Sequence, residues 1–325
     1  MTGVENASSP PRAGVAWSWQ AATAGAVYAL PAAVVAVQDP TAGLSLAVGV
    51  LPAAILPMPG RRRSRIAILI IGVVAGVSMF LGGTLALLPT WVASVLLVSI
   101  VTGAAALSAV APGGRLVLTL CAPLVAVGLS FADVATSLAT MVLVVAGAAY
   151  AWLVSLCWPE RSRAPRAEVA RPDVHRMVGY GLRLGTAAAI AYAVAAGLGM
   201  DHPGWAPGAC LLVARPEVDL LRSRGIARVV AVLVGASVAV AVLALEPPSS
   251  VYAAVAVLAM AGVAGTTGSR WYITAGFSTA LVLLLLLHDD EAQTAQKVGE
   301  RVGETVLGVG LAFLFGWVLP SLRRR

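Results

Sequence analysis

The stretch from residue 66 to residue 110 decides the fold, and it reads IAILIIGVVAGVSMFLGGTLALLPTWVASVLLVSIVTGAAALSAV. It contains no charged residue and divides into two apolar runs, 66–88 and 91–110, separated by Pro89 and Thr90. A helix needs about 20 apolar residues to cross the hydrocarbon core of a bilayer, and each run has that length. Membrane β-strands need only about 10 residues and alternate in polarity, so these runs predict two membrane-spanning helices.

The remainder of the chain has a similar composition. Of the 325 residues, 59% are hydrophobic and only 11% are charged, whereas a soluble domain has about 25% charged residues. The net charge of +7 would suit a nucleic-acid partner, but the basic residues, nearly all Arg, lie in short connections between apolar runs. Three Cys residues lie far apart, without the spacing of metal ligands. We therefore expect no nucleic-acid partner, no metal and no cofactor.

Further apolar segments follow throughout the chain, and we count twelve in total. The first six are 19–37, 42–58, 66–88, 91–110, 116–129 and 134–158. The second six are 178–198, 205–214, 227–245, 251–266, 272–287 and 298–319. The predicted fold class is therefore all-α, a polytopic membrane protein with about twelve transmembrane helices.

The distribution of charge predicts the orientation of these helices. With a cytoplasmic N-terminus, the Arg-rich connections fall on the cytoplasmic side, with 61–65 and 159–176 among the richest. Only Lys297 and Arg301 fall on the opposite side, where Asp and Glu residues prevail. An excess of Arg and Lys marks cytoplasmic loops. We expect a multi-pass protein of the plasma membrane with both termini in the cytoplasm.

The polar, Arg-rich and Pro-rich stretch 159–176 divides the chain into two halves. The predicted parts are a tail (1–18), a first six-helix repeat (19–158), a cytoplasmic linker (159–176), a second six-helix repeat (177–320) and a basic tail (321–325). Short motifs recur between the halves at offsets near 160 residues. The recurring pairs are Arg63-Ser64-Arg65 with Arg222-Ser223-Arg224, Gly76-Val77-Ser78 with Gly235-Ala236-Ser237, Thr23 with Thr186, and Asp39 with Asp201. Because each half has an even number of segments, the repeats are predicted to be parallel.

Two segments at matching positions are interrupted by proline. Segment 205–214 is about half the length needed to span and contains Pro207, and segment 42–58 contains Pro52 and Pro57. Broken spans at corresponding positions of two halves indicate a transport site. The alternative is an ordinary kinked or re-entrant helix.

Three predicted spans supply the candidate substrate-binding residues. Arg183 lies inside segment 178–198, where it either snorkels to the interface or binds an anion. Arg301 and Glu304, followed by Thr305, lie at i,i+3 spacing in segment 298–319. They form either a self-neutralising ion pair or a site in which Arg301 meets a substrate carboxylate and Glu304 handles a proton. Trp205 and Pro207, on segment 205–214, complete the set, and Trp205 with Tyr272 could stack on an aromatic ring.

The second half resembles a known family. Trp205-Ala206-Pro207, then Arg215-Pro216, then Arg224, Arg228 and Gly235 resemble the fusaric-acid-resistance (FUSC) and aromatic-acid-exporter family. Arg270-Trp271-Tyr272, and Arg301 followed by Thr305 and Gly308, continue the resemblance, which covers about residues 178–320. The resemblance implies efflux of aromatic or other organic carboxylates, driven by the proton gradient.

Several functions are compatible with these observations. We expect an exporter of small organic acids and not an enzyme, because no convergent acid, base or metal cluster stands out. The alternatives are an anion channel, as in plant malate channels related to this family, and a membrane scaffold or assembly subunit that transports nothing. The expected partners are a small organic anion and the lipid bilayer, and a homo-oligomer is left open.

The charge distribution leads to a test of the orientation. A reporter protein fused within 159–175 should be active only if it is of a kind that functions in the cytoplasm, because the five Arg residues of 159–176 hold this linker on that side. Paired fusions to a cytoplasmic and to an external reporter measure this directly. Activity of the external reporter at this position would contradict the predicted topology.

Overall fold

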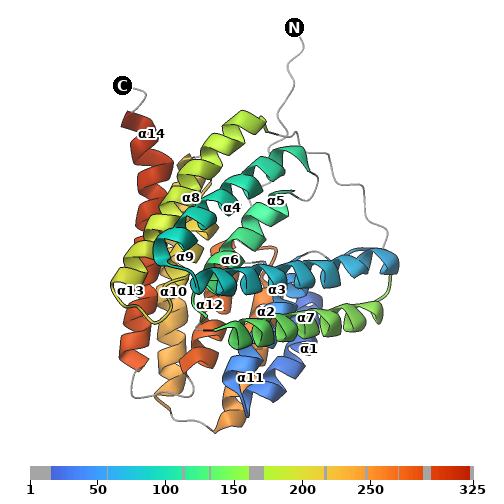
Figure 1. Ribbon diagram of the computed structural model, residues 1–325. Helices are drawn as coiled ribbons and strands as arrows, with labels where there is room; N and C mark the ends of the chain where they lie inside the picture. The colour runs from blue at the N-terminus through green and yellow to red at the C-terminus, as the bar shows by residue number, and fades with distance from the viewer. Residues whose placement is uncertain are drawn as a thin grey trace.

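The computed structural model describes residues 16–56, 58–111, 114–131, 133–160, 172–215, 218–245, 248–269, 271–287 and 294–322. These residues form helices and short connections, with no strand among them (Figure 1). In the first half the elements are α1 (Trp19–Ala36), α2 (Pro40–Ile55), η1 (Arg62–Arg65), α3 (Ile66–Ala86), α4 (Thr90–Val110), α5 (Gly114–Leu116), η2 (Val117–Cys121), α6 (Ala122–Gly128) and α7 (Val134–Leu156). In the second half they are α8 (Val174–Gly197), α9 (Trp205–Val213), α10 (Val218–Leu243), α11 (Ser249–Gly265), α12 (Trp271–Leu287), α13 (Thr294–Phe313), η4 (Leu314–Val318) and α14 (Leu319–Leu322).

Seven helical stretches in the described residues are long and apolar enough to cross a membrane. They lie in α1, η1 with α3, α4, α7, α8, α10, and α13 with η4. Shorter apolar helices correspond to α2, to α5 through α6, to α11 and to α12. The structure is therefore an all-α, multi-pass membrane protein. Each of the twelve predicted segments overlaps a helix, but crossing by all twelve stays a prediction.

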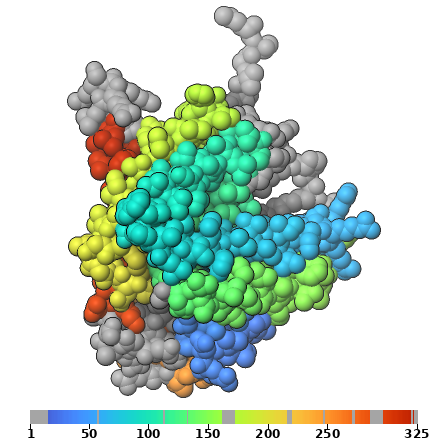
Figure 2. All heavy atoms as spheres, in the orientation of Figure 1, coloured from blue at the N-terminus to red at the C-terminus, as the bar shows by residue number. Residues whose placement is uncertain are grey.

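The surface of the long helices supports a lipid environment. In the space-filling view, α3, α4, α7 and α8 lie side by side on one face (Figure 2). Large apolar side chains on these helices point outward and are at least half exposed; they include Ile70, Val95, Val142, Leu153 and Leu182. Such a continuous apolar surface would be unfavourable in water, so lipid is its natural solvent.

One boundary differs clearly from the sequence prediction. The apolar run was expected to begin at 227, whereas α10 begins at Val218. The residues between include Arg222 and Arg224, which end the apolar pattern but are good helix formers. The helix therefore continues beyond its apolar portion, because helix formation requires only local backbone hydrogen bonds and not an apolar surface.

Several helices begin at an acidic residue in a turn. The Asp39 side chain accepts a hydrogen bond from the Ala42 N–H at 2.8 Å, and Asp173 accepts one from the Arg176 N–H at 2.9 Å. Asp133 accepts hydrogen bonds from both the backbone N–H and the hydroxyl of Thr136, and these bonds lower the pKa of Asp133. The acidic residues of these turns thus satisfy the free N–H groups at the helix N-termini.

The two halves contact each other through their first and fourth helices. α4 packs along α8, and α1 packs along α11 (Figure 1). Within the first half α3 packs on α6 and α7, and α2 packs on α1 and α7. Within the second half α10 packs on α12 and α13, and α9 packs on α8 and α13. Replacing each helix by its counterpart in the other half therefore reproduces the same set of pairs.

Glycines allow these helices to approach closely. Gly82 on α3 lies against Gly128 on α6, and a Cβ atom added at Gly82 would clash with the Val125 carbonyl. Gly147 on α7 lies against the backbone of α2, next to Leu46 and Gly49. Small residues at helix contacts are typical of membrane proteins, because apolar attraction between helices is weak when the solvent is itself apolar.

This contact predicts a specific destabilisation. Gly82→Leu should lower the free energy of unfolding by about 1–3 kcal/mol or more, because the new side chain must push α3 away from α6. The matched control is Gly103→Leu on α4, where a Cβ atom meets nothing within 4 Å. Thermal unfolding in detergent measures both. Equal melting temperatures for the two variants would contradict the close contact.

Candidate functional site

The short helix α9 is the centre of the candidate site. It has nine residues, all but one of them buried, and it packs against α6, α8 and α13. Its start is fixed to the first half, because the Gly204 N–H donates a hydrogen bond to the Ser130 hydroxyl at 2.9 Å. Pro207 lies in the first turn of α9, where a missing N–H leaves no intrahelical bond unmade. Pro207 thus does not break this helix, and α2 likewise continues through Pro52 to Ile55.

Trp205, at the beginning of α9, is enclosed by two neighbours. The His202 ring stacks on it, with centroids 4.6 Å apart and an interplanar angle of 28°. The Arg301 guanidinium lies over the Trp205 ring, with Cζ 4.0 Å from the centroid. A cation so placed is attracted by the electrons of the ring. Burial lowers the pKa of His202, although the charge of Asp201 opposes this effect, so the neutral form of the ring is favoured.

Arg301 and Glu304 form the ion pair that the i,i+3 spacing predicts. Arg301 Nη1 and Glu304 Oε2 are 3.8 Å apart, and the two side chains are 11% and 1% exposed. Neither carboxylate oxygen of Glu304 has a hydrogen-bond partner among the described residues. The neighbouring hydroxyl of Thr305 donates to the Arg301 carbonyl at 2.9 Å. The charge of Glu304 is therefore balanced by Arg301, but the carboxylate lacks the hydrogen bonds that normally accompany a buried carboxylate.

A second arginine, Arg228 on α10, belongs to the same buried cluster. It is 8% exposed, and its Nε atom has no hydrogen-bond partner in the part of the chain that the structure describes. Its charge acts on Arg301. In the sequence Arg228 stands at the start of the apolar segment 227–245, directly after the Arg-rich residues 222–224, and the structure buries its side chain. Its position inside the apolar segment 227–245 is the sequence feature that could have predicted this burial.

The cluster thus holds two buried guanidinium groups and one carboxylate. In the described residues, Glu304 pairs with Arg301, and the charges of Glu300 and Asp201 also act on Glu304. A buried charge without compensation costs several kcal/mol. An anion in contact with Arg228 would reduce this cost for a guanidinium whose Nε atom has no partner among the described residues.

The comparisons with known proteins cover this region. Residues 187–321 match the family described as fusaric acid resistance protein-like. This fusaric acid resistance protein-like segment contains α9, α10 and α13, and with them Trp205, Arg228, Arg301 and Glu304. The resemblance expected for about 178–320 is confirmed over the matched residues. No curated protein and no solved structure matches the chain.

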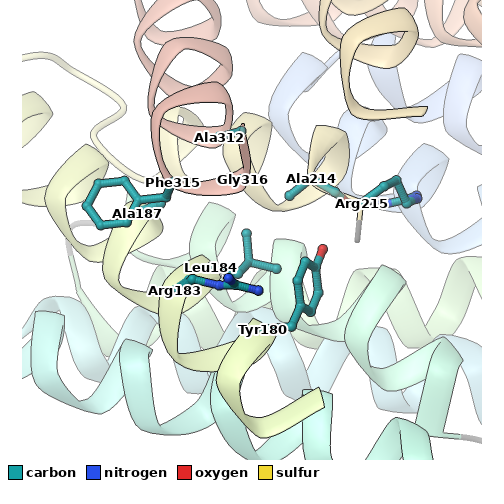
Figure 3. Close-up of a pocket in the computed structure, with 9 residues that line it drawn as sticks. All are labelled: Tyr180, Arg183, Leu184, Ala187, Ala214, Arg215, Ala312, Phe315 and Gly316. Atoms are coloured by element: carbon teal, nitrogen blue, oxygen red, sulfur yellow. Dashed lines mark hydrogen bonds between the residues drawn. The ribbon is translucent and has the colours of Figure 1, made fainter. Parts of the chain in front are cut away.

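Arg183 precedes the fusaric acid resistance protein-like segment and lies in a different place. It lines a small cavity together with Tyr180, Arg215 and Phe315, as Figure 3 shows. Phe315 follows Arg301 by fourteen residues of helix, which corresponds to about 20 Å. The predicted site residues thus divide into two groups. Trp205, Pro207, Arg301, Glu304 and Thr305 gather where α9 meets α13, and Arg183 lies near the other end of α9. The side chain of Tyr272 lies outside the described residues.

The buried pair predicts a non-additive stability effect. Arg301→Met should lower the free energy of unfolding by about 3–5 kcal/mol, because it leaves the Glu304 carboxylate buried without its paired cation. The double variant Arg301→Met with Glu304→Leu should recover most of this loss. Equilibrium unfolding in mixed micelles measures both variants.

The control for this prediction is Arg222→Met, which removes an exposed arginine of α10 and should change stability little. If Arg301→Met is as stable as the unmodified protein, the pair does not contribute to stability.

Proposed function

We propose that this protein exports small organic anions across the plasma membrane in a proton-coupled manner, with aromatic carboxylates as the expected substrates. The observation that carries this proposal is the buried cluster in which Arg228 lies near Arg301 and the Nε atoms of both guanidinium groups have no partner among the described residues. The match to a family whose description refers to fusaric acid resistance supports an efflux-related role in the membrane. A transporter, and not an enzyme, accounts for a charged cluster inside an apolar helix bundle.

A substrate carboxylate suits the cluster chemically. Guanidinium groups bind carboxylates through charge-assisted hydrogen bonds, and the Nε atoms of Arg228 and Arg301 are both buried without a partner in the described chain. A substrate ring has less room to stack on Trp205, because the His202 ring and the Arg301 guanidinium already contact it. A substrate ring that stacks on Trp205 must therefore displace His202.

Glu304 provides a physical link between the substrate and protons. When Glu304 is ionised it competes with the substrate carboxylate for Arg301, from which it is 3.8 Å distant. When Glu304 takes up a proton, Arg301 is released for the substrate. The charges of Glu300 and Asp201 also act on Glu304. Anion binding and proton binding are thus coupled through one arginine.

The arrangement of the spans is part of the proposal. We propose twelve crossings in two parallel six-helix repeats, with both termini in the cytoplasm. The matching helix pairs of the two halves support this layout, and so do two local details. The hydroxyls of Thr23 and Thr186 each donate to the carbonyl four residues earlier, and those of Ser78 and Ser237 do the same. These two pairs of recurring residues therefore make the same local hydrogen bond in both halves, whereas Arg63-Ser64-Arg65 lies in the 3-10 helix η1 and Arg222-Ser223-Arg224 lies in α10. The bilayer and the organic anion are the proposed partners, and self-association is left open.

Transport by purified protein tests the function. In liposomes with an imposed pH gradient, the protein should accumulate labelled benzoate against its concentration gradient. Arg301→Gln and Arg228→Gln should each reduce the rate about tenfold or more, since each removes a charged hydrogen-bond donor for the carboxylate. Glu304→Gln should still exchange benzoate across the membrane but should lose the dependence on the pH gradient.

The matched control is Arg222→Gln on the exposed part of α10, which should transport normally. Folding of each variant is checked by thermal unfolding. Passive benzoate currents without accumulation would instead identify an anion channel, and no benzoate movement at all would contradict the proposed function.

A further inference from the structure

A second set of basic residues surrounds a cavity at the opposite end of α9. The cavity has a volume of about 380 Å³ and lies where α4 ends, α5 and α8 begin, and α9 ends. A smaller cavity adjoins it and shares Tyr180, Leu184, Ala214 and Arg215 with it (Figure 3). We call the two together the basic cavity. Its position coincides with the Arg-rich connections that the charge distribution places in the cytoplasm.

Four arginines line the basic cavity. Arg115 comes from α5, Arg176 and Arg183 come from α8, and Arg215 follows α9. No Asp or Glu is among the lining residues that the structure describes. The nearest acidic residue in the chain before α8 is Asp173, and its carboxylate is engaged by the backbone N–H of Arg176. The cavity therefore brings together four guanidinium groups, each with several N–H donors that can bind an anion.

The rest of the lining is apolar. Leu118, Met177, Leu211 and Phe315 supply aliphatic and aromatic surface, and the Tyr180 ring stands between the Arg183 and Arg215 sides in Figure 3. A cavity of this volume is at the small end of known ligand sites. Its chemistry suits a compact molecule with one anionic group and an apolar body, which describes an aromatic carboxylate.

The first half contains a counterpart without charge. A cavity of about 390 Å³ is lined by α1, α2, the end of α11 and Trp158, the counterparts of the elements around the basic cavity. Gln20 lines it at the position that corresponds to Arg183, and no Arg, Lys, Asp or Glu lines it in the described residues. A cavity of this shape thus forms without arginines. A cavity of this volume therefore does not require arginines, and the several N–H donors of each guanidinium group suit the four arginines to binding a carboxylate.

We propose that the basic cavity is a loading site, where a small carboxylate binds from the cytoplasmic side before it reaches the Arg228–Arg301 cluster. α9 joins the two places, since Ala214 and Arg215 at its end line the cavity and Trp205 at its start contacts Arg301. Its nine residues extend over about 14 Å. The role in loading rests on the proposed export function, whereas the binding of carboxylate does not.

Equilibrium binding tests the site. Labelled benzoate is bound to the protein in nanodiscs of neutral phosphatidylcholine. The double variant Arg115→Gln with Arg176→Gln should raise the dissociation constant about tenfold or more, since two charged donors are lost. Arg222→Gln, with one exposed charge removed elsewhere, and Gln20→Ala, in the uncharged cavity, should bind as the unmodified protein does. Arg301→Gln should retain binding at the basic cavity.

Transport measurements separate the two proposals. In liposomes, the double variant should show a raised KM for benzoate presented on the cytoplasmic side, with kcat little changed. If the protein transports benzoate and the double variant has an unchanged KM, the loading site is wrong and the export function stands. If benzoate binds in an arginine-dependent manner but is not transported by the unmodified protein, the carboxylate site stands and the export function fails.

A lipid headgroup is the competing source of an anionic group. The protein is therefore also purified in nanodiscs that contain phosphatidylglycerol, and bound lipid is quantified for each variant. Loss of bound phosphatidylglycerol in the double variant, together with unchanged benzoate binding, would overturn the proposal. Thermal unfolding confirms that the compared variants are folded, and single variants at Arg115 and Arg176 replace the double variant if it is not.

Discussion

Close contact between helices through small residues is the constraint on which this structure depends. Surrounding lipid is as apolar as the helices themselves, so burial of apolar surface drives association far less than it does in water. Contacts such as Gly82 with Gly128, and Gly308 with the backbone of α9, bring helices near enough for many weak attractions to add up. The buried core is accordingly rich in Ala.

The same close packing gives the charged cluster its properties. Gly308 lies against Ala206 and Cys210, so α13 approaches α9 and places Arg301 over Trp205. Side chains held in this way are removed from water. Both the attraction and the repulsion between charges are stronger in this less polar interior than in water. An anion that enters the cluster gains more from Arg301 than it would at an exposed arginine. Fold and chemistry are therefore consequences of one packing arrangement.

The two halves share their helix pairs but differ in their charges. Gly147 on α7 contacts α2 as Gly308 on α13 contacts α9. If these glycines are aligned, the positions of Arg301 and Glu304 correspond to Thr140 and Leu143. The cavities show the same difference, because arginines line the basic cavity of the second half and no charged residue lines the described part of the cavity of the first half. The ionisable side chains are thus concentrated in the second half, which is also where the family match lies.

The class of the protein could be predicted from the amino-acid sequence, because the length of an apolar run and the spacing of Arg301 and Glu304 are local properties. The sequence also located the helices and the resemblance to the family. The helix packing was needed to learn that Arg228 joins Arg301, that Arg183 lies at the far end of α9, and that Arg115 and Arg215 line one cavity. These residues are distant in the chain, and their proximity depends on which helices pack together. That choice follows from the shapes of whole helix surfaces, which no short sequence pattern records.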